Sequence, residues 1–297
     1  MSTVALGLAI WNGERYLEEL LDSLRNQDYR DFVLYVLDNQ STDKTQEILE
    51  LYSNDPRIIV HIDTQRRGFV DAQKVLFERY LVNHKYCAFV CDDDLYESNY
   101  LSLNINNILN NALSLSYCNF NYIDERGVVT SPKKDGPLYE GKGYRNSLKF
   151  FYFRNCIPLF FGVYVTEFLE HHMPNFRRVD EFGYNHENLM LFSLLHHCNV
   201  GFIASRCFSY RIKNRREVYK MRGYWDDRSS FGDLVVNIKH NWRFSYECNK
   251  LVFDAFGKNK TPTFFMLLIT PFCFLKYTFG VFVYQFILKW HILFVRR

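Results

Sequence analysis

The chain begins with an alternation of apolar strands and amphipathic helices, and this alternation limits its fold more than any other feature of the sequence. The first run, Val4–Ile10, is apolar throughout, which is the pattern of a strand buried on both faces. After a turn at Asn12 and Gly13, four leucines follow the i, i+3, i+4, i+7 spacing of one helix face: Leu17, Leu20, Leu21 and Leu24.

Three further apolar strands are predicted at residues 32–37, 58–62 and 86–91, with helices between them. Four rounds of strand and helix predict an α/β fold with a mostly parallel central sheet flanked by helices. In such sheets ligands collect at the carboxyl ends of the strands. Acidic residues stand at two such ends, Asp38 after the second strand and three aspartates at 92–94 after the fourth.

The rest of the chain is less regular. It predicts a strand at 116–123, a loop to about 137, a helix near 184–197 and a strand near 200–204. No G-x-G-x-x-G motif follows the first strand, which disfavours a dinucleotide oxidoreductase.

Charge is divided unevenly along the sequence. Residues 1–205 carry 19 Lys and Arg against 27 Asp and Glu, whereas residues 206–297 carry 17 against 6. The acidic part suits a divalent cation, and the basic, aromatic part suits an anionic membrane surface or phosphate groups. No nucleic acid is expected as a partner. The eight cysteines form no C-x-x-C pair and no secretory signal opens the chain, so reduced thiols and a cytoplasmic location are predicted.

Two apolar, Phe-rich runs, 263–275 and 277–288, stand near the end of the chain and are separated by Lys276. Each run is shorter than the ~20 residues that span a bilayer. We therefore predict a domain at 1–215 followed by a helical, membrane-associated region at 216–297. The protein is expected to be peripheral at the inner face of the cell membrane. A buried terminal helix pair is the competing interpretation of the two runs.

Several motifs stand in a fixed order along the first 125 positions. They are Trp11-Asn12-Gly13 with Tyr16-Leu17, Leu21-x-Ser23-Leu24-x-x-Gln27, LDNQSTDKT at 37–45, Gly68 with Ala72, and Asp92-Asp93-Asp94 before Tyr100-Leu101. In this order they resemble the motifs of family 2 glycosyltransferases, which have the GT-A fold. Each motif is weak by itself, and the resemblance is looser from about 125 to 211.

The resemblance implies a metal-dependent, inverting transfer of a sugar from a nucleoside diphosphate donor, of UDP or dTDP type, to an acceptor hydroxyl. It places Asp92 near the ribose and Asp93 or Asp94 on the metal ion, Mn²⁺ or Mg²⁺. Such ions prefer oxygen ligands, and they neutralise the charge of the departing diphosphate. Adjacent carboxylates repel one another, and the metal rather than a side chain is the positive group expected beside them. A surface turn with a helix-capping aspartate is the alternative.

Asp38 and Asn39 are expected to recognise the base of the nucleotide. A carboxylate accepts the N3–H of uracil or thymine, but an Asn in place of a second Asp leaves the identity of the base open. Arg67 and Gln73, with Arg66, are expected to lie near the base or the phosphates. For Asp38 and Asn39, the competing interpretation is a strand-end turn held by Asx hydrogen bonds. For Arg66, Arg67 and Gln73, it is a solvated basic turn.

The resemblance implies that Glu187, at the start of a late helix, is the general base that takes the proton of the acceptor hydroxyl. An alternative alignment puts Asn188 at that position, in which case His186 would replace it or activity would be impaired. A carboxylate that complements the helix dipole is a further interpretation of Glu187. Arg211 and Lys213 stand where similar enzymes place a basic residue near the diphosphate, and a membrane-facing basic patch is the alternative.

The predicted acceptor is a lipid-linked or polysaccharide glycan. Two alternatives remain open: transfer to a polyprenyl phosphate, whose ionised acceptor needs no strong base, and a non-catalytic, membrane-bound sugar-nucleotide binding protein on a degenerate GT-A scaffold.

Overall fold

The computed structural model describes residues 2–132, 139–153, 157–172 and 186–212, together with Tyr246 and Thr270. The chain divides into two compact units, Met1–Ser147 with Asn155–Arg215, and Leu148–Arg154 with Arg216–Arg297. The predicted membrane-associated region, 216–297, lies outside the described residues apart from the two isolated positions. Within the described segments, no helix is long and apolar enough to cross a bilayer. The elements of the candidate site belong to the first unit.

Four parallel strands form one half of the sheet, as the sequence predicts. They are β1 (Val4–Ile10), β2 (Phe32–Asp38), β3 (Ile58–Ile62) and β4 (Tyr86–Val90), in the spatial order β3-β2-β1-β4. Six of the seven residues of β1 are buried, because this strand lies in the interior of the sheet with helices on both faces.

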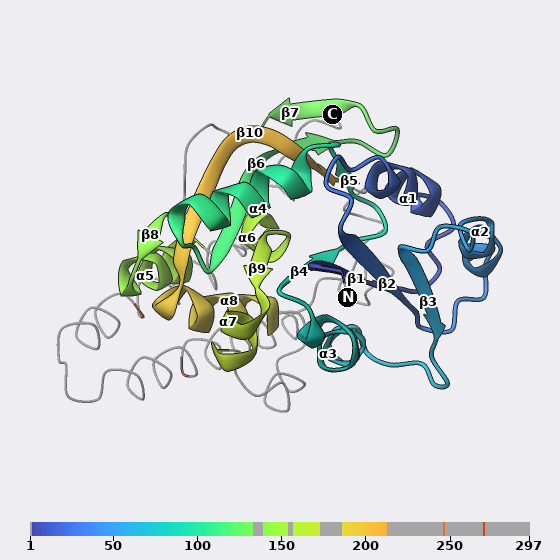
Figure 1. Cartoon of the computed structure of the whole chain (residues 1–297), viewed down its shortest axis with the longest axis horizontal. Helices are drawn as coiled ribbons and strands as arrows, with labels where there is room; N and C mark the ends of the chain where they lie inside the picture. Colours follow the sequence, from blue (N-terminus) through green and yellow to red (C-terminus); the bar gives the residue numbers. More distant parts are fainter. Residues whose placement is uncertain are drawn as a thin grey trace, which may run out of the picture. The chain divides into compact units, whose positions relative to one another are not determined.

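Three helices cover this half (Figure 1). They are α1 (Leu17–Arg25), α2 (Thr45–Leu51) and α3 (Phe69–Arg79), which is followed by a 3₁₀ turn, η1 (Leu81–Asn83). The four leucines of α1 are buried, as their spacing predicts. α1 and α2 lie on one side of the sheet and α3 on the other, where Ala72 and Leu76 pack on Leu37 of β2.

The second half of the sheet mixes directions. It contains β5 (Leu95–Tyr96), β6 (Leu115–Ile123), β9 (Val163–Val165) and β10 (Asn199–Arg211), and the full order is β3-β2-β1-β4-β9-β6-β10-β5. β9 is antiparallel to β4 and β6, β10 is parallel to β6, and β5 is antiparallel to β10. The predicted α/β fold with a mostly parallel central sheet is confirmed.

Shorter elements surround this half: α4 (Tyr100–Asn111), β8 (Gly141–Lys142), α5 (Tyr144–Phe153), α6 (Ile157–Phe160), α7 (Thr166–His172) and α8 (His186–His197). The region predicted as a loop to about 137 instead contains a strand, β7 (Val129–Pro132), which pairs antiparallel with β6. The turn between them contains Gly127 at φ +79°, a left-handed conformation that glycine adopts without strain.

β10 is much longer than the strand predicted near 200–204. Its pairing with β6 shifts register between Ile203 and Arg206 and again between Arg206 and Phe208. Such irregularities bend a strand and increase its twist. The strand is strongly curved in Figure 1, and its last residue, Arg211, reaches the region of α1 and β5.

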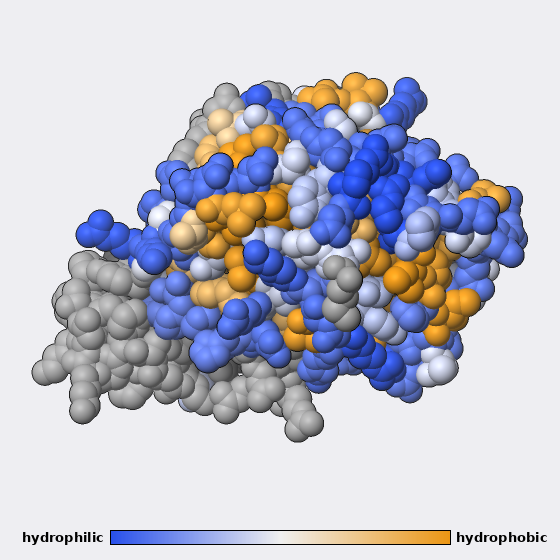
Figure 2. Space-filling view, viewed as in Figure 1, coloured by the Kyte–Doolittle hydropathy of each residue, from blue (hydrophilic) through white to orange (hydrophobic). Residues whose placement is uncertain are grey.

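The outer edge of the parallel half is covered less well. Only Ile58 of the five β3 residues is buried, and Ile59 and Ile62 are exposed. Figure 2 shows hydrophobic colour around this edge of the molecule.

Candidate functional site

The ends of three neighbouring strands meet at one edge of the sheet. β2, β1 and β4 are parallel neighbours, so the residues that follow each of them lie at the same edge. The main-chain N–H of Asn39 donates to the carbonyl oxygen of Ile10 at 2.8 Å, and the N–H of Thr42 donates to Asn12 Oδ1 at 2.8 Å. The structure therefore gathers Asp38, Asn39 and the aspartates at 92–94, as predicted.

Asp92 lies against the loop that follows β1. A Cβ atom at Gly13 would stand 3.0 Å from Asp92 Oδ2 and 2.5 Å from Ile10 Cδ1. The approach to Ile10 is closer than real Cβ contacts and the approach to Asp92 is tighter than most, so a side chain at position 13 would displace the side chains of Ile10 and Asp92. This contact joins the acidic turn after β4 to the motif residues after β1.

Asp93 and Asp94 are the members of the acidic turn that come together around one point. One ligand atom each from Asp93, Asp94 and Cys91 lies within 4.8 Å of the others. Asp93 is half-buried, whereas Asp94 is only 1% exposed. Two carboxylates fit the oxygen preference of Mn²⁺ and Mg²⁺, and the thiol of Cys91 is a softer donor. The donor set at this turn is therefore compatible with the predicted metal ion.

Asp38 is fully buried at the end of β2, with 0% of the residue exposed. Its Oδ1 atom accepts a hydrogen bond from the main-chain N–H of Ser41 at 3.0 Å, and its Oδ2 atom accepts from Gln46 Nε2 at 2.6 Å. Both carboxylate oxygens thus hold the loop and the helix that follow β2. A nucleotide base that pairs with Asp38 therefore has to displace one of these two donors or share an oxygen with it.

Asn39 joins the β2 end to the loop between β3 and α3. Its Nδ2 donates to the carbonyl oxygen of Arg67 at 2.9 Å, and its Oδ1 accepts from the main-chain N–H of Arg67 at 2.7 Å. The pair uses an amide donor and an amide acceptor together, which a carboxylate could not reproduce. The asparagine that departs from the double-Asp pattern therefore has a structural partner in this chain.

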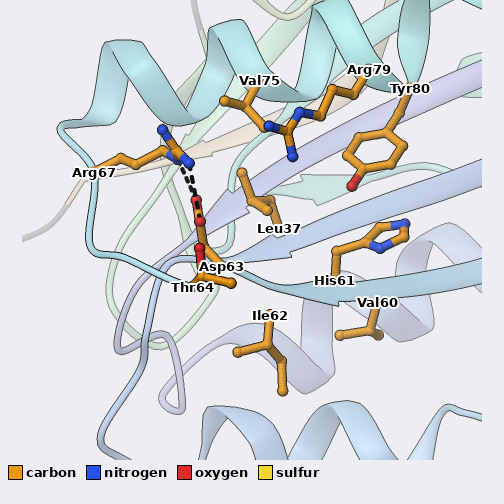
Figure 3. Close-up of a pocket in the computed structure, with 10 residues that line it drawn as sticks. All are labelled: Leu37, Val60, His61, Ile62, Asp63, Thr64, Arg67, Val75, Arg79 and Tyr80. Atoms are coloured by element: carbon orange, nitrogen blue, oxygen red, sulfur yellow. Dashed lines mark hydrogen bonds and ion pairs between the residues drawn. The ribbon is translucent and has the colours of Figure 1, made fainter.

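The Arg67 guanidinium pairs with Asp63, with Nε 2.5 Å from Oδ2 and Nη2 3.3 Å from Oδ1 (Figure 3). Burial raises the pKa of the Asp63 carboxyl, but the hydrogen bonds from Arg67 and neighbouring main-chain groups outweigh it and leave that pKa below its ordinary value. Both side chains line a hollow of about 420 Å³ between β3 and α3, together with His61 and Tyr80.

The site also contains Trp11, a motif residue for which the sequence predicts no separate role. Trp11 follows β1 and is 46% exposed. The guanidinium carbon of Arg66 lies 3.6 Å from the centroid of its ring, a cation–π contact. A tryptophan directly after an apolar run is the signal that the sequence offers for this position.

Two predicted residues are placed by their helices. Gln73 is buried in α3. Glu187 is the second residue of α8, so it occupies the first turn of a helix as predicted, and its side chain lies outside the described part of the structure. The predicted role of Glu187 stays a prediction.

Arg211 lies beside the acidic turn. Its side chain is 0% exposed, and its guanidinium donates to the carbonyl oxygen of Asp93. A buried cation that is paired with Glu19 therefore also lies at this turn, and the metal ion expected beside the aspartates stays a prediction. Lys213, predicted with it, lies outside the described residues.

Comparisons with known proteins agree with this architecture. The sequence model of a family described as glycosyl transferase family 2 matches residues 7–167. A WfgD protein of Escherichia coli, named UDP-Glc:alpha-D-GlcNAc-diphosphoundecaprenol beta-1,3-glucosyltransferase, is 26% identical over 127 residues, which cover 42% of this chain and 49% of WfgD. An uncharacterized glycosyltransferase of Haemophilus influenzae is 27% identical over 45% of this chain and 55% of its own length. The chain thus spans about half the length of these relatives.

Solved structures of TarS from Staphylococcus aureus, residues 1–349, resemble the chain with a TM-score of 0.58. The match covers 87% of this chain and 73% of TarS at 16% sequence identity, so it bears on the fold alone. TarS structures in complex with UDP and with UDP-GlcNAc match with the same TM-score.

Proposed function

The chain belongs to glycosyl transferase family 2, whose sequence model matches more than half of it, and we propose that it transfers a sugar from a nucleoside diphosphate sugar to a glycan acceptor. The observation that carries the proposal is the acidic turn after β4: Asp92 lies beside Gly13 of the loop that follows β1, and ligand atoms of Asp93 and Asp94 lie close to one another. Carboxylates at the ends of adjacent parallel strands are placed to receive a ligand at the edge of the sheet.

In the proposed donor complex, Asp93 and Asp94 hold a Mn²⁺ or Mg²⁺ ion and Asp92 binds a ribose hydroxyl. The ion supplies positive charge for the diphosphate leaving group. The base lies at the β2 end, against Asp38, Asn39 and the exposed ring of Trp11, and it takes over hydrogen bonds that Ser41, Gln46 and Arg67 now make. Arg67 and Gln73 border this end. A UDP-type donor is supported by the shared fold with TarS, which binds UDP-GlcNAc.

On the acceptor side, Glu187 takes the proton of the attacking hydroxyl, and a single displacement inverts the anomeric centre. The acceptor is a lipid-linked or polysaccharide glycan, and residues 216–297 keep the protein at the inner membrane face where such acceptors are assembled. The name of WfgD, which refers to a diphosphoundecaprenol-linked sugar, supports this class of acceptor.

A screen of sugar nucleotides tests the donor. The purified full chain is heated with UDP-glucose, UDP-GlcNAc, a dTDP-sugar or GDP-mannose, with and without Mn²⁺. We expect a UDP- or dTDP-sugar to raise the melting temperature only when Mn²⁺ is present, because a ligand that binds the native state stabilises it by mass action. Stabilisation by none of these nucleotides would contradict the proposed function.

Replacement Glu187→Gln tests the acceptor chemistry. We expect donor binding to persist while turnover falls by about 10² to 10⁴, the usual contribution of a general base. A variant with near-normal turnover on a polyprenyl phosphate would instead assign the ionised phosphate as the acceptor.

A further inference from the structure

We propose that Arg211 is a positioning residue of the metal site, which fixes the Asp93–Asp94 turn from inside the protein and does not bind the donor diphosphate. The inference rests on the proposed function, because it assumes that this turn holds the metal ion. It departs from the role that the family resemblance implies for a basic residue at this point of the chain.

Arg211 contacts the turn in two ways. Its main-chain N–H donates to Asp94 Oδ1 at 2.9 Å, and its Nε donates to the main-chain carbonyl oxygen of Asp93 at 2.7 Å. The first bond orients the carboxylate of Asp94, and the second fixes the peptide unit between the two aspartates. Together they set the direction in which the two candidate metal ligands point.

The other two guanidinium nitrogens are held by two further segments of the chain. Nη1 donates to the carbonyl oxygens of Asp124 and Glu125 at 3.3 and 3.2 Å, and Nη2 lies 2.7 Å from Glu19 Oε2 on α1. The Arg211 guanidinium carbon also lies 4.2 Å from the ring centroid of Tyr16. Contacts to α1, to the turn between β6 and β7, and to the acidic turn therefore leave the guanidinium one orientation.

These contacts also explain why Arg211 is not a phosphate ligand. Its side chain is 0% exposed, and all three guanidinium nitrogens already donate to protein oxygens. A buried charge is costly unless it is paired and hydrogen-bonded, and removing its partners to reach a phosphate would restore that cost. The two register shifts in β10 bend the strand so that its last residue reaches this interior position.

The planar fork of arginine is essential to this arrangement. Its nitrogens donate in fixed, different directions, whereas the lysine ammonium is a compact charge on a flexible stem. Groups that orient metal ligands from behind typically change metal affinity by about 10- to 100-fold when they are altered. A lysine would keep the charge and lose the geometry, so Arg211→Lys separates the two contributions.

The experiment measures Mn²⁺ affinity by electron paramagnetic resonance without nucleotide, and UDP affinity by calorimetry at saturating Mn²⁺. It uses the wild-type full chain, Arg211→Lys and Glu19→Gln, which loosens the guanidinium from the exposed side. Glu18→Gln is the matched control, because Glu18 is exposed in the same first turn of α1 and, in the described part of the structure, its side chain makes no hydrogen bond or ion pair with Arg211. Melting temperatures are recorded for all four proteins.

We expect Arg211→Lys to weaken Mn²⁺ binding by about 10- to 100-fold. Glu19→Gln should weaken it by about two- to fivefold, as for the loss of a partly exposed ion pair, and Glu18→Gln should not change it. UDP affinity at saturating Mn²⁺ should stay within about threefold of wild type in every variant, because the phosphates do not contact Arg211.

Unchanged Mn²⁺ affinity in Arg211→Lys, with UDP binding weakened more than about tenfold, would overturn the inference and make Arg211 a phosphate ligand. If Arg211→Lys does not fold, Glu19→Gln decides, and equal Mn²⁺ affinity in Glu19→Gln and Glu18→Gln overturns the positioning role. A wild-type chain that binds neither Mn²⁺ nor UDP would refute the proposed function itself, which is a different outcome from either of these.

Discussion

The ends of β2 and β4 are both acidic and lie at the same edge of the sheet, but their carboxylates are used differently. At the β2 end, Asp38 is fully buried and each of its oxygens accepts a hydrogen bond from a neighbouring residue. At the β4 end, Asp93 is half-buried, and a ligand atom of Asp93 lies within 4.8 Å of ligand atoms of Asp94 and Cys91.

This difference separates two kinds of work that one residue type can do. Asp38 and Asn39 organise the loops around the end of β2, where the base is proposed to bind, and Asp93 and Asp94 form the part of the site that is proposed to hold the metal ion. An acidic residue at a strand end is thus not in itself a sign of metal binding. The partners of its oxygens decide which kind of work it does. The predictions below test this division from the largest expected effect to the smallest.

The largest effect is expected from Asp94→Asn. The amide keeps an oxygen for the main-chain N–H of Arg211 but lacks the charge that a divalent ion requires. We expect sugar transfer to fall by at least about 100-fold, the scale on which lost electrostatic stabilisation acts, with little change in melting temperature. Activity within tenfold of wild type at saturating Mn²⁺ would show that this aspartate is not a metal ligand.

Replacement of Asp38 should lower stability in addition to its effect on the proposed binding of the base. In Asp38→Ala, the main-chain N–H of Ser41 and the side chain of Gln46 lose a buried acceptor, which costs about 1–3 kcal/mol in the free energy of unfolding measured in urea. Asp38→Asn is the matched control. It keeps one acceptor for Ser41, and its NH₂ can donate to the reoriented amide of Gln46. If Asp38→Asn kept its stability but lost UDP affinity, direct recognition of the base by Asp38 would be supported.

Asn39→Asp should loosen the loop between β3 and α3. The carboxylate cannot donate to the carbonyl oxygen of Arg67, so two acceptors face each other where an amide pair stood. We expect a loss of about 1–2 kcal/mol in unfolding free energy and faster hydrogen exchange of the Arg67 amide. Asn12→Asp is the control. The side chain of Asn12 accepts a hydrogen bond from the main-chain N–H of Thr42, and a carboxylate can accept the same bond. Equal losses in the two variants would remove the special role of Asn39.

The smallest effect concerns the ion pair of Asp63 and Arg67. Because the pKa of Asp63 in the folded protein lies below its ordinary value of 3.8, its contribution to stability is present above that value and is lost as pH falls through the lower, folded pKa. We expect Asp63→Asn to lower stability at pH 7 by less than about 1 kcal/mol and to narrow the difference from wild type near pH 3. If the difference in stability between wild type and Asp63→Asn were the same at pH 7 and pH 3, the contribution of the ionised Asp63 carboxylate would be contradicted.

Much of the parallel half of the sheet could be predicted from the sequence, because local signals define it. Continuous apolar runs mark β1, β2 and β4, and the leucine spacing marks the buried face of α1. The strand ends then place Asp38 and the aspartates at 92–94 at one edge without any knowledge of their contacts.

The rest of the site depends on contacts between residues that are far apart in the chain. Nothing in the local sequence pairs Asn39 with the main chain of Arg67 or sends the side chain of Arg211 inward to Glu19. β10 was predicted too short because two register shifts interrupt its pairing, and β7 was missed because it lies in a stretch of loop-like composition. Such features follow from tertiary packing and not from local pattern.

The most direct test of the division between the two strand ends is a Mn²⁺ titration of the full-length wild type, Asp94→Asn and Asp38→Asn, followed by electron paramagnetic resonance. Wild type and Asp38→Asn are expected to bind Mn²⁺ with affinities within about threefold of each other, and Asp94→Asn is expected to bind at least about 100-fold more weakly. Equal Mn²⁺ affinity in all three proteins, or a selective loss in Asp38→Asn, would contradict the account.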